Sequence, residues 1–292
     1  MKFIKLFFLF LILINSLFSR AEAIKIGLLD GVKEAVIGTS SEAAVINGET
    51  HTAIYKTEAM KPYLFKAKGK SVTAEINGKT FNLSSSKIII KPNAKGFVSA
   101  KKRWYRGSLI VENRGGSLVI INDVPIEEYI LGVVPSEMPS KWHQEALKAQ
   151  AIAARSYAIA NRGKRGSHGY DLKDTPEDQA YGGATSETYS TNKAVIDTKG
   201  IVVTYNKKVI PAYYSASAGG QTVNAGNLWN KDLPYLRSVP SYDEGIAKNG
   251  HGIGMSQHGA NNLAQKGYNA YQILTYFYNN IKFGRLDPSW TL

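Results

Sequence analysis

The chain of 292 residues contains no cysteine. Disulfide bonds and metal sites built on thiolates are therefore excluded. Acidic residues are also scarce, because 23 Asp and Glu stand against 36 Lys and Arg and leave a formal net charge of +13. Such a protein suits an anionic surface, for example a cell wall or membrane headgroups. Nucleic acid would also fit the charge, but the usual nucleic-acid-binding motifs are missing and the N-terminus indicates export.

Long apolar runs are absent beyond the N-terminus. Lys2 and Lys5 precede an apolar run over residues 6–14, and residues 21–23 have the small-x-small pattern of a cleavage site. The run is shorter than the ~20 apolar residues that a membrane span needs. We therefore expect residues 1–23 to be a signal peptide and the protein to be exported to the periplasm or cell wall. An uncleaved N-terminal membrane anchor is the alternative.

Residues 24–104 lack a sustained helical period. Short apolar runs alternate there with turn signals, and Asn77-Gly78 between residues 72–76 and 79–83 is typical of a β-hairpin. A further hairpin is expected from residues 105–112 and 117–121. This pattern predicts a mostly β region that serves as a scaffold.

One short stretch near the middle of the chain is a candidate site. Glu137 lies between Pro135 and Pro139, directly after an expected short helix over residues 126–131. Proline fixes φ, removes a backbone donor and restricts the residue before it, so we expect a stiff loop that displays Glu137. A carboxylate held in this way is a candidate general acid or base. An ordinary solvated loop glutamate gives the same pattern.

An alanine-rich helix is expected immediately afterwards, from Lys141 to about Arg162, with Ser140 as its N-cap. Seven alanines on several faces favour close packing and a central, buried position. Arg155 lies among them, and a buried arginine needs a partner. Arg155 therefore either faces solvent or meets a carboxylate or a substrate anion. Together with the β region, this helix predicts an α+β fold.

Two glycine-rich segments supply the other candidates. Residues 215–220 include Ser217, and glycines there permit a ligand to approach the backbone closely. Residues 250–259 present His251, Gln257 and His258 just before an expected helix over residues 260–266. Either segment is equally consistent with an ordinary tight turn. Two histidines alone do not make a zinc site.

Five motifs occur in a specific order along the chain. They are Ile126-Glu-Glu-Tyr-Ile-Leu-Gly-Val-Val-Pro-Ser-Glu-Met-Pro139, Glu145-Ala-Leu-Lys-Ala-Gln-Ala-Ile-Ala-Ala-Arg-Ser-Tyr157, Gln179-Ala-Tyr-Gly182, Tyr214-Ser-Ala-Ser-Ala-Gly-Gly220 and Gly250-His-Gly-Ile-Gly-Met-Ser-Gln-His-Gly-Ala260. In this order they resemble the SpoIID/LytB family, which comprises stage II sporulation protein D and the amidase-enhancer proteins. The resemblance covers about residues 105–283. We therefore expect a signal peptide over 1–23, a β-rich region over 24–104 and a mixed α+β SpoIID-like catalytic domain over 105–292.

The resemblance implies a lytic transglycosylase that acts on peptidoglycan glycan strands, preferably strands stripped of their stem peptides. It assigns the catalytic role to Glu137 and implicates Arg155 in activity, and it implies that the two glycine-rich motifs line the cleft. The substrate-binding candidates are Arg155, Ser217, His251, Gln257 and His258. Some members of the family hold a zinc ion with two cysteines and a histidine. This chain has Lys173, Glu177 and Asp178 at about those positions, so we expect neither a metal nor another cofactor.

A single well-placed acid limits the chemistry. Glycosidases normally use two carboxylates, whereas a lytic transglycosylase needs one. Glu137 would protonate the oxygen between MurNAc and GlcNAc and then accept the proton of the muramyl C6 hydroxyl, leaving a 1,6-anhydro end. Two alternatives stay open. The protein binds the wall and stimulates a separate amidase without being an enzyme, or it is a metal-dependent hydrolase built on Glu137, His251 and His258.

Overall fold

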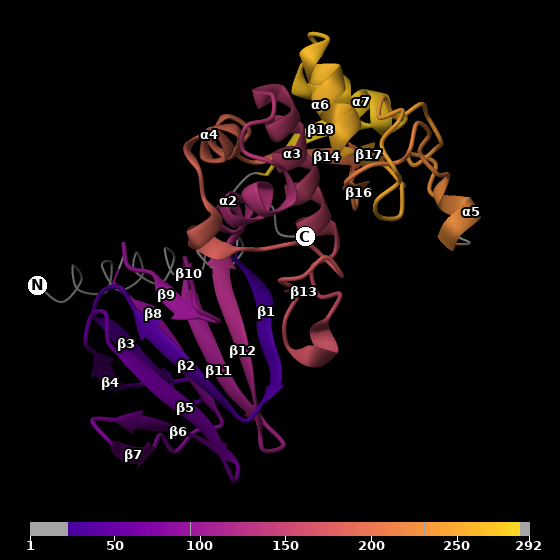
Figure 1. Ribbon diagram of the computed structural model, residues 1–292. Coiled ribbons are helices and arrows are strands. Elements are labelled where there is room, and N and C mark those ends of the chain that lie inside the picture. The colour runs from indigo at the N-terminus through magenta and orange to yellow at the C-terminus, as the bar shows by residue number, and fades with distance from the viewer. Residues whose placement is uncertain (1–22, 94, 230–231, 287–292) are drawn as a thin grey trace, which may run out of the picture.

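The structure is a computed structural model, and it describes residues 23–93, 95–229 and 232–286. The predicted signal peptide, apart from Ala23, lies outside these residues. Two β-sheets occupy one end of the molecule and a group of helices occupies the other (Figure 1). The predicted α+β fold with a β-rich N-terminal region is therefore confirmed. No helix within the described part of the chain is long and apolar enough to cross a bilayer.

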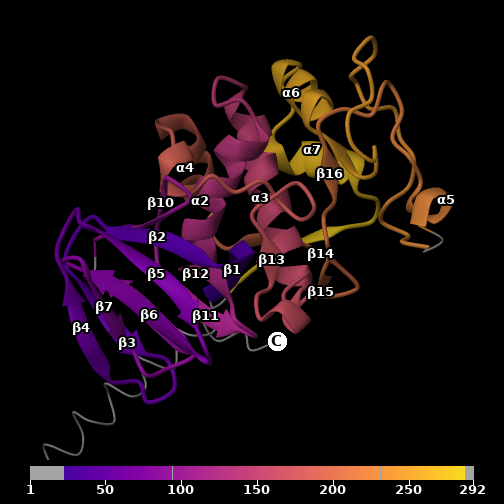
Figure 2. The ribbon, with the colours of Figure 1, turned by 60° about the horizontal axis from the view of Figure 1, so that its bottom comes forward.

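The two sheets form the β-rich end. The larger sheet has the order β13 (Leu172–Lys173), β1 (Ala23–Val32), β12 (Ser117–Pro125), β11 (Ser108–Arg114), β8 (Lys87–Pro92), β3 (Ala43–Asn47) and β4 (Ala53–Thr57). The smaller sheet has the order β10 (Arg103–Tyr105), β9 (Val98–Ala100), β2 (Glu34–Thr39), β5 (Pro62–Lys68), β6 (Ser71–Ile76) and β7 (Lys79–Asn82). Their strands alternate buried and exposed residues, so one face of each sheet packs in the core between them (Figure 2).

The two predicted hairpins are present. β6 and β7 are joined by Asn77 and Gly78, whose φ angles of 51° and 73° are those of the turn expected from Asn-Gly. β11 and β12 pair along their whole length. Because both strands lie in the middle of the larger sheet, the boundary predicted at residue 104 falls inside a sheet and not between two separate structural units.

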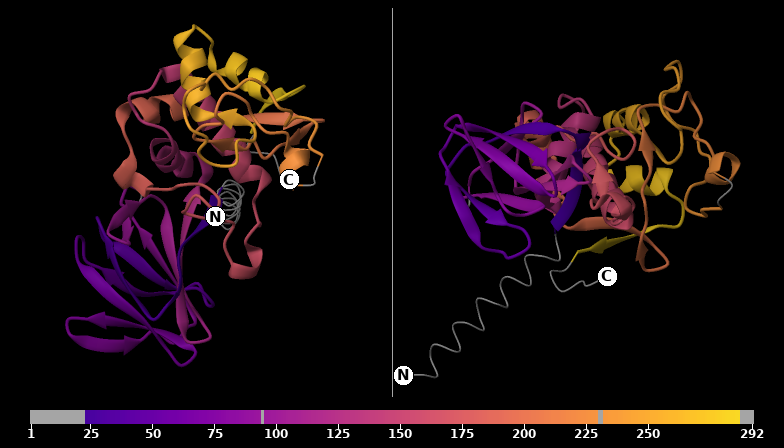
Figure 3. Two further views of the ribbon diagram at one scale, coloured as in Figure 1. Left: turned by 45° about the vertical axis from the view of Figure 1, so that its right-hand side comes forward. Right: turned by 90° about the horizontal axis from the view of Figure 1, so that it is seen from below.

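Five helices form the other end: α2 (Ile126–Glu137), α3 (Gln144–Ala160), α4 (Tyr189–Asp197), α6 (Gln257–Gln265) and α7 (Ala270–Phe277). α3 contacts all the others, and its alanines from Ala146 to Ala158 are completely buried. The prediction of a central, alanine-rich helix is confirmed. Its first turn begins later than predicted, because His143 and not Ser140 caps it by accepting the N–H of Glu145. Figure 3 shows α2 and α3 between the sheets and the C-terminal helices.

Short elements complete the chain. They are η1 (Gly166–His168), η2 (Gly183–Ser186), β14 (Ile201–Tyr205), β15 (Lys208–Val209), β16 (Tyr214–Ser215), α5 (Ala225–Trp229), β17 (Met255–Ser256) and β18 (Lys282–Arg285). β14 pairs with β15 and β18, and β16 pairs with β17.

The predicted loop around Glu137 is wrong, because α2 runs through Pro135 and ends at Glu137 itself. Proline in the last turn removes one intrahelical hydrogen bond. Other hydrogen bonds hold this turn: the Ser136 hydroxyl donates to the Gly132 carbonyl over 2.7 Å, and the Met138 backbone N–H donates to the Val134 carbonyl over 2.9 Å. Glu137 is therefore positioned by a helix end and not by a loop.

A buried ion pair fixes α2 against α3. Arg155 is fully buried, and its Nε and Nη2 each donate to a carboxylate oxygen of Glu127 over 2.8 Å. The same guanidinium donates to the Ile201 carbonyl over 3.0 Å, and the Gly200 N–H donates to Glu127 over 2.9 Å. The pair thus connects α2, α3 and the start of β14.

Removing the arginine should leave a poorly solvated carboxylate without its counterion. We predict that Arg155→Met lowers the free energy of unfolding by about 3–5 kcal/mol, measured by urea denaturation. Adding Glu127→Leu to that variant should recover part of the loss, because no unpaired charge then remains. Lys61→Met, which breaks an exposed pair with Glu58, should change stability by less than about 1 kcal/mol. Equal effects of the two single substitutions would contradict this account.

Candidate active site

Glu137 is held by hydrogen bonds at the end of α2. The Ala180 N–H donates to one carboxylate oxygen over 2.7 Å, and the Gln257 side-chain amide donates to the other over 3.3 Å. Burial raises the pKa of Glu137 above 4.5, and hydrogen bonds from Ala180, Gln257 and Tyr214 partly oppose that rise. The carboxyl group is therefore biased towards its protonated form but keeps donors that accommodate the ionised form.

The segment that supplies Ala180 packs closely on α2. The Gly182 N–H donates to the Ser136 hydroxyl over 2.9 Å. A side chain at Gly132 would collide with the ring of Tyr181, at 2.6 Å from an added Cβ. Glycine at position 132 is thus what allows residues 180–182 to reach Glu137.

A chain of polar side chains continues behind the carboxylate. The Gln179 amide nitrogen donates to the Tyr214 hydroxyl over 2.8 Å and to the Ala154 carbonyl over 3.2 Å. The Tyr129 hydroxyl donates to the Gln179 amide oxygen over 3.3 Å. Burial keeps the pKa of Tyr214 well above 10, so its hydroxyl remains a proton donor at neutral pH.

Parallel pairing of two short strands brings the C-terminal candidates to Glu137. β16 and β17 align Tyr214 with Met255 and Ser215 with Ser256, and Gln257 begins α6 immediately afterwards. Gly250, Gly252 and Gly254 precede this point with φ angles of 98°, 73° and 73°. Such left-handed backbone favours glycine, which explains the alternating glycines of the sequence.

Asp243 connects the loop after β16 to the end of β17 by hydrogen bonds. Its completely buried carboxylate accepts the N–H groups of Ala218 and Gly220 over 2.6 and 2.7 Å and the hydroxyl of Ser256 over 2.6 Å. The Ser241 hydroxyl is a fourth partner. These hydrogen bonds lower the pKa of Asp243 despite its burial. Since Ser256 also caps α6, Asp243 links the glycine-rich loop to the helix end that presents Gln257.

The two histidines occupy different surroundings. The ring of His258 lies 4.8 Å from that of Trp142, and both side chains are partly exposed. His251 accepts the Ile253 N–H at Nδ1 over 2.9 Å and packs beside Trp229. Burial and nearby Lys248 lower the pKa of His251, so the neutral ring carries its proton on Nε2. Both rings are therefore able to contact a polar ligand.

Two predicted substrate-binding residues do not fit that role. Ser217 is 1% exposed, and its hydroxyl donates to the Ala247 carbonyl over 2.7 Å. Arg155 is 0% exposed and pairs with Glu127, which precedes Glu137 by ten residues, or about 15 Å along the helix axis. Arg155 thus meets a carboxylate, which is one of the alternatives expected from the sequence, and its donors are already used inside the protein.

The positions corresponding to the zinc ligands of some SpoIID-like proteins do not suit a metal. Asp178 accepts hydrogen bonds from Lys164 over 2.6 Å and Arg165 over 3.0 Å, and Glu177 pairs with Lys173 over 2.8 Å. Cations of the protein thus occupy both carboxylates. Within the described ranges no group of three or more His, Asp and Glu side chains gathers as a metal site would require.

The sequence did not single out several residues that complete the site. Tyr214 and Gln179 were noticed only within motifs, and Asp243 was not noticed at all. Asp243 lies in a segment without a regular element, and three of its four partners are 13 to 25 residues away. Only a nearby serine, Ser241, could have hinted at a local hydrogen bond.

The part of the chain around α2 and α3 is similar in sequence to known proteins. Residues 114–205 match the family model described as Stage II sporulation protein (SpoIID). Residues 114–205 therefore belong to the SpoIID/LytB family. The matched SpoIID segment contains Glu137, Arg155 and the residues 179–182, whereas the glycine-rich segments lie outside it.

Individual relatives of this SpoIID-family chain match over part of their length. The Amidase enhancer of Bacillus subtilis (strain 168) is 46% identical over 105 residues, which cover 36% of this chain and 14% of that protein. Stage II sporulation protein D of Bacillus amyloliquefaciens is 38% identical over 136 residues, covering 41% of this chain and 40% of the relative. An uncharacterized protein of Brachyspira hyodysenteriae is 38% identical over 136 residues, which cover 46% of this chain and 37% of that protein. Each match spans less than half of the relative.

The raised pKa of Glu137 makes stability depend on pH. Its stabilising contribution is complete below the unfolded-state pKa near 4.5 and is lost as pH rises through the folded-state value. We therefore predict that wild type loses free energy of unfolding relative to Glu137→Gln as pH rises from 4 to neutrality. Urea denaturation of both proteins over that range measures the difference, in which all other titrating groups cancel. The prediction is contradicted if the stability of wild type relative to Glu137→Gln stays constant or increases as pH rises.

Asp243 should control Glu137 through Gln257. Asp243→Asn replaces one acceptor oxygen with a donor, so we predict a loss of about 2–4 kcal/mol in the free energy of unfolding and a further rise in the pKa of Glu137. Carboxyl NMR titration measures the pKa. Glu244→Gln changes the neighbouring exposed carboxylate and should alter neither quantity. An unchanged Glu137 pKa in Asp243→Asn would show that the two carboxylates are not coupled.

Proposed function

We propose that this protein is a lytic transglycosylase that cleaves peptidoglycan glycan strands, preferably after their stem peptides have been removed. The observation that supports this most is the setting of Glu137, a carboxyl group with a raised pKa and hydrogen bonds to both oxygens. A raised pKa suits a group that must hold a proton and then release it. SpoIID/LytB membership supports a role at the cell wall.

The proposed reaction uses one carboxyl group twice. Protonated Glu137 donates to the oxygen that joins MurNAc to GlcNAc, the bond from the muramyl C1 to that oxygen breaks, and GlcNAc leaves as the alcohol. The C6 hydroxyl of the same MurNAc attacks C1 and gives its proton to ionised Glu137. The products are a free GlcNAc end and a 1,6-anhydro-MurNAc end, and no water is consumed. Glu137 returns to its protonated form.

The surroundings of Glu137 suit both halves of this cycle. Burial favours the protonated form before the first transfer, and the N–H of Ala180 and the amide of Gln257 stabilise the carboxylate after it. Hydrolysis by two acids is less well supported. Asp243, the other buried carboxylate near the two loops, already accepts four hydrogen bonds and has a lowered pKa.

A second function is favoured by one relative's name. The protein called Amidase enhancer is similar to this chain, so stimulation of a separate cell-wall amidase without glycan cleavage is the alternative. Both functions place the protein outside the cytoplasm.

We therefore propose that the protein is exported and that residues 1–23 are removed. Recovery of exported protein that begins at a residue far from Ile24, or that retains Met1, would refute that cleavage.

Glu137→Gln tests the reaction directly. The amide keeps the shape of the side chain but has no transferable proton, so we predict that anhydro ends fall by at least about a thousandfold while glycan binding persists. The assay incubates purified protein with peptide-free glycan strands and detects anhydro ends by mass spectrometry. Lys70→Gln, an exposed substitution in the β-rich region that lies outside any pocket described here, should leave cleavage unchanged.

The same variants separate the two functions. If the wild type yields no anhydro ends but both wild type and Glu137→Gln stimulate an amidase, the enhancer function replaces the enzymatic one. If Glu137→Gln cleaves as well as wild type, Glu137 is not the acid.

A further inference from the structure

Positive charge is distributed unevenly along the chain. Residues 24–104 contain 14 Lys and Arg against six Asp and Glu, a net charge of +8, whereas residues 105–292 contain 19 against 16, a net charge of +3. The excess therefore belongs to the β-rich region and not to the part that holds Glu137. A polymer with negative charges is attracted to that region.

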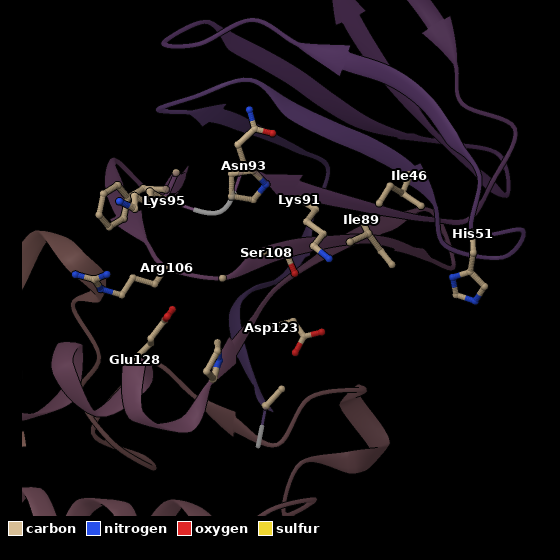
Figure 4. A pocket seen from close by; sticks show the side chains of 16 residues that line it. Ile46, His51, Ile89, Lys91, Asn93, Lys95, Arg106, Ser108, Asp123 and Glu128 are labelled. Carbon is tan, nitrogen blue, oxygen red and sulfur yellow. The ribbon is translucent and has the colours of Figure 1, made fainter. Parts of the chain in front are cut away.

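A pocket of about 530 Å³ lies in the β-rich region, where the outer face of the larger sheet meets the start of α2 (Figure 4). This volume is within the range of about 300–1,000 Å³ that is typical of ligand sites. β3, β8, β11 and β12 supply its floor, the connections next to these strands contribute further lining residues, and Glu128 of α2 closes one side. The pocket is separate from the contacts of Glu137.

Strand register arranges a polar row across the floor of this pocket. β11 and β12 pair Ser108 with Asp123. β8 and β11 pair Ile90 with Leu109, so the next residues, Lys91 and Ser108, also lie opposite each other. Adjacent strands are about 4.8 Å apart. Lys91, Ser108 and Asp123 therefore follow one another on adjacent strands and offer an ammonium group, a hydroxyl and a carboxylate on one face of the sheet.

An apolar row runs beside the polar one on the same face. The register aligns Ile46 with Ile89, Ile89 with Ile110, and Ile110 with Ile121. Tyr170 packs over Ile110 and Ile121, whereas Ile46 and Ile89 line the pocket. The pocket floor thus combines polar groups with a small apolar surface.

This combination matches a sugar ring, which has hydroxyls at its edge and C–H groups on its faces. Both signs of charge line the pocket, so Asp123 and Glu128 make it a poorer site for a densely charged polyanion than the basic region around it. A sugar with several hydroxyls and one carboxylate fits better, because its carboxylate pairs with the ammonium group and its hydroxyls bind the polar groups of the row. Lys91 is exposed, and its side chain makes no hydrogen bond or ion pair to any part of the chain that the structure describes, so its ammonium group is available to a ligand.

We propose that this pocket is a second glycan-binding site, which holds a MurNAc unit with its lactyl carboxylate at Lys91 and its hydroxyls at Ser108 and Asp123. The inference rests on the proposed glycan substrate. Removal of the stem peptide frees that carboxylate, which is otherwise bound in an amide. The site therefore favours stripped strands over strands that carry peptides.

α2 connects this pocket to the acid. Glu128 lines the pocket, and Glu137 follows nine residues later, about 14 Å along the helix axis. A strand of several sugars is long enough to occupy both places. Binding at two points on one strand raises the total affinity without new contacts at either.

The test uses the full chain with Glu137→Gln, so that strands remain uncut, and peptide-free glycan strands as the probe. Lys91→Glu should weaken binding about tenfold, because its carboxylate repels that of MurNAc and the second attachment is lost. Lys68→Glu is the matched control, since Lys68 is also exposed in the β-rich region and lies outside the pocket. It should change the dissociation constant by less than about twofold.

Two further measurements test whether the lactyl carboxylate is the group that is bound and whether it is bound in this pocket. Carboxyl-reduced strands should bind equally with and without Lys91→Glu, and peptide-free strands should shift NMR signals of residues 89–91 and 108–109. Equal losses in Lys91→Glu and Lys68→Glu, or shifts confined to residues 179–182 and 257, would overturn the site. Binding at Lys91 by a wild-type chain that cleaves nothing would instead refute the proposed reaction and leave this site standing.

Discussion

The buried pair of Arg155 and Glu127 is the constraint on which the helical end of the molecule depends. Charges are expensive to bury, so such a pair persists only when its geometry and its remaining hydrogen bonds are good. Here the guanidinium binds both carboxylate oxygens and a carbonyl of β14, and the carboxylate also accepts the N–H of Gly200. This fixes the start of α2, and a rigid helix carries the constraint to Glu137 at its other end.

Close packing carries the same constraint to the neighbouring segments. Glycine at position 132 lets residues 181–183 lie against α2, and completely buried alanines let α3 contact four helices. Glu137 thus receives one hydrogen bond from a segment packed on its own helix and another from Gln257 of α6. Its environment is assembled by tertiary structure, although the residue itself ends a local element.

The sequence predicted the elements that depend on local patterns. Alternating strands, the Asn77-Gly78 turn and the alanine-rich helix follow from short-range rules, and the ordered motifs identified the family and Glu137. The prediction that Pro135 ends the helix was wrong. A proline in the last turn removes only one intrahelical hydrogen bond, and α2 continues to Glu137 without it. Ser217 and Arg155 were assigned to substrate because sequence does not reveal which polar side chains already have partners. Asp243 was not predicted for the related reason that three of its four donors lie 13 to 25 residues away.

Glu137 and Asp243 show how partners, and not residue type, decide what a carboxylate does. Asp243 is buried and Glu137 is partly buried, and burial by itself raises the pKa of each carboxyl group. Asp243 accepts four hydrogen bonds, which outweigh that effect and lower its pKa. Glu137 has weaker support, including a 3.3 Å contact, and its pKa stays raised. A structural anion needs enough donors to remain charged, whereas an acid that must donate and recover a proton needs fewer. The setting of Asp243 therefore suits a structural role in holding the loops, and the setting of Glu137 suits the proton transfer proposed for it.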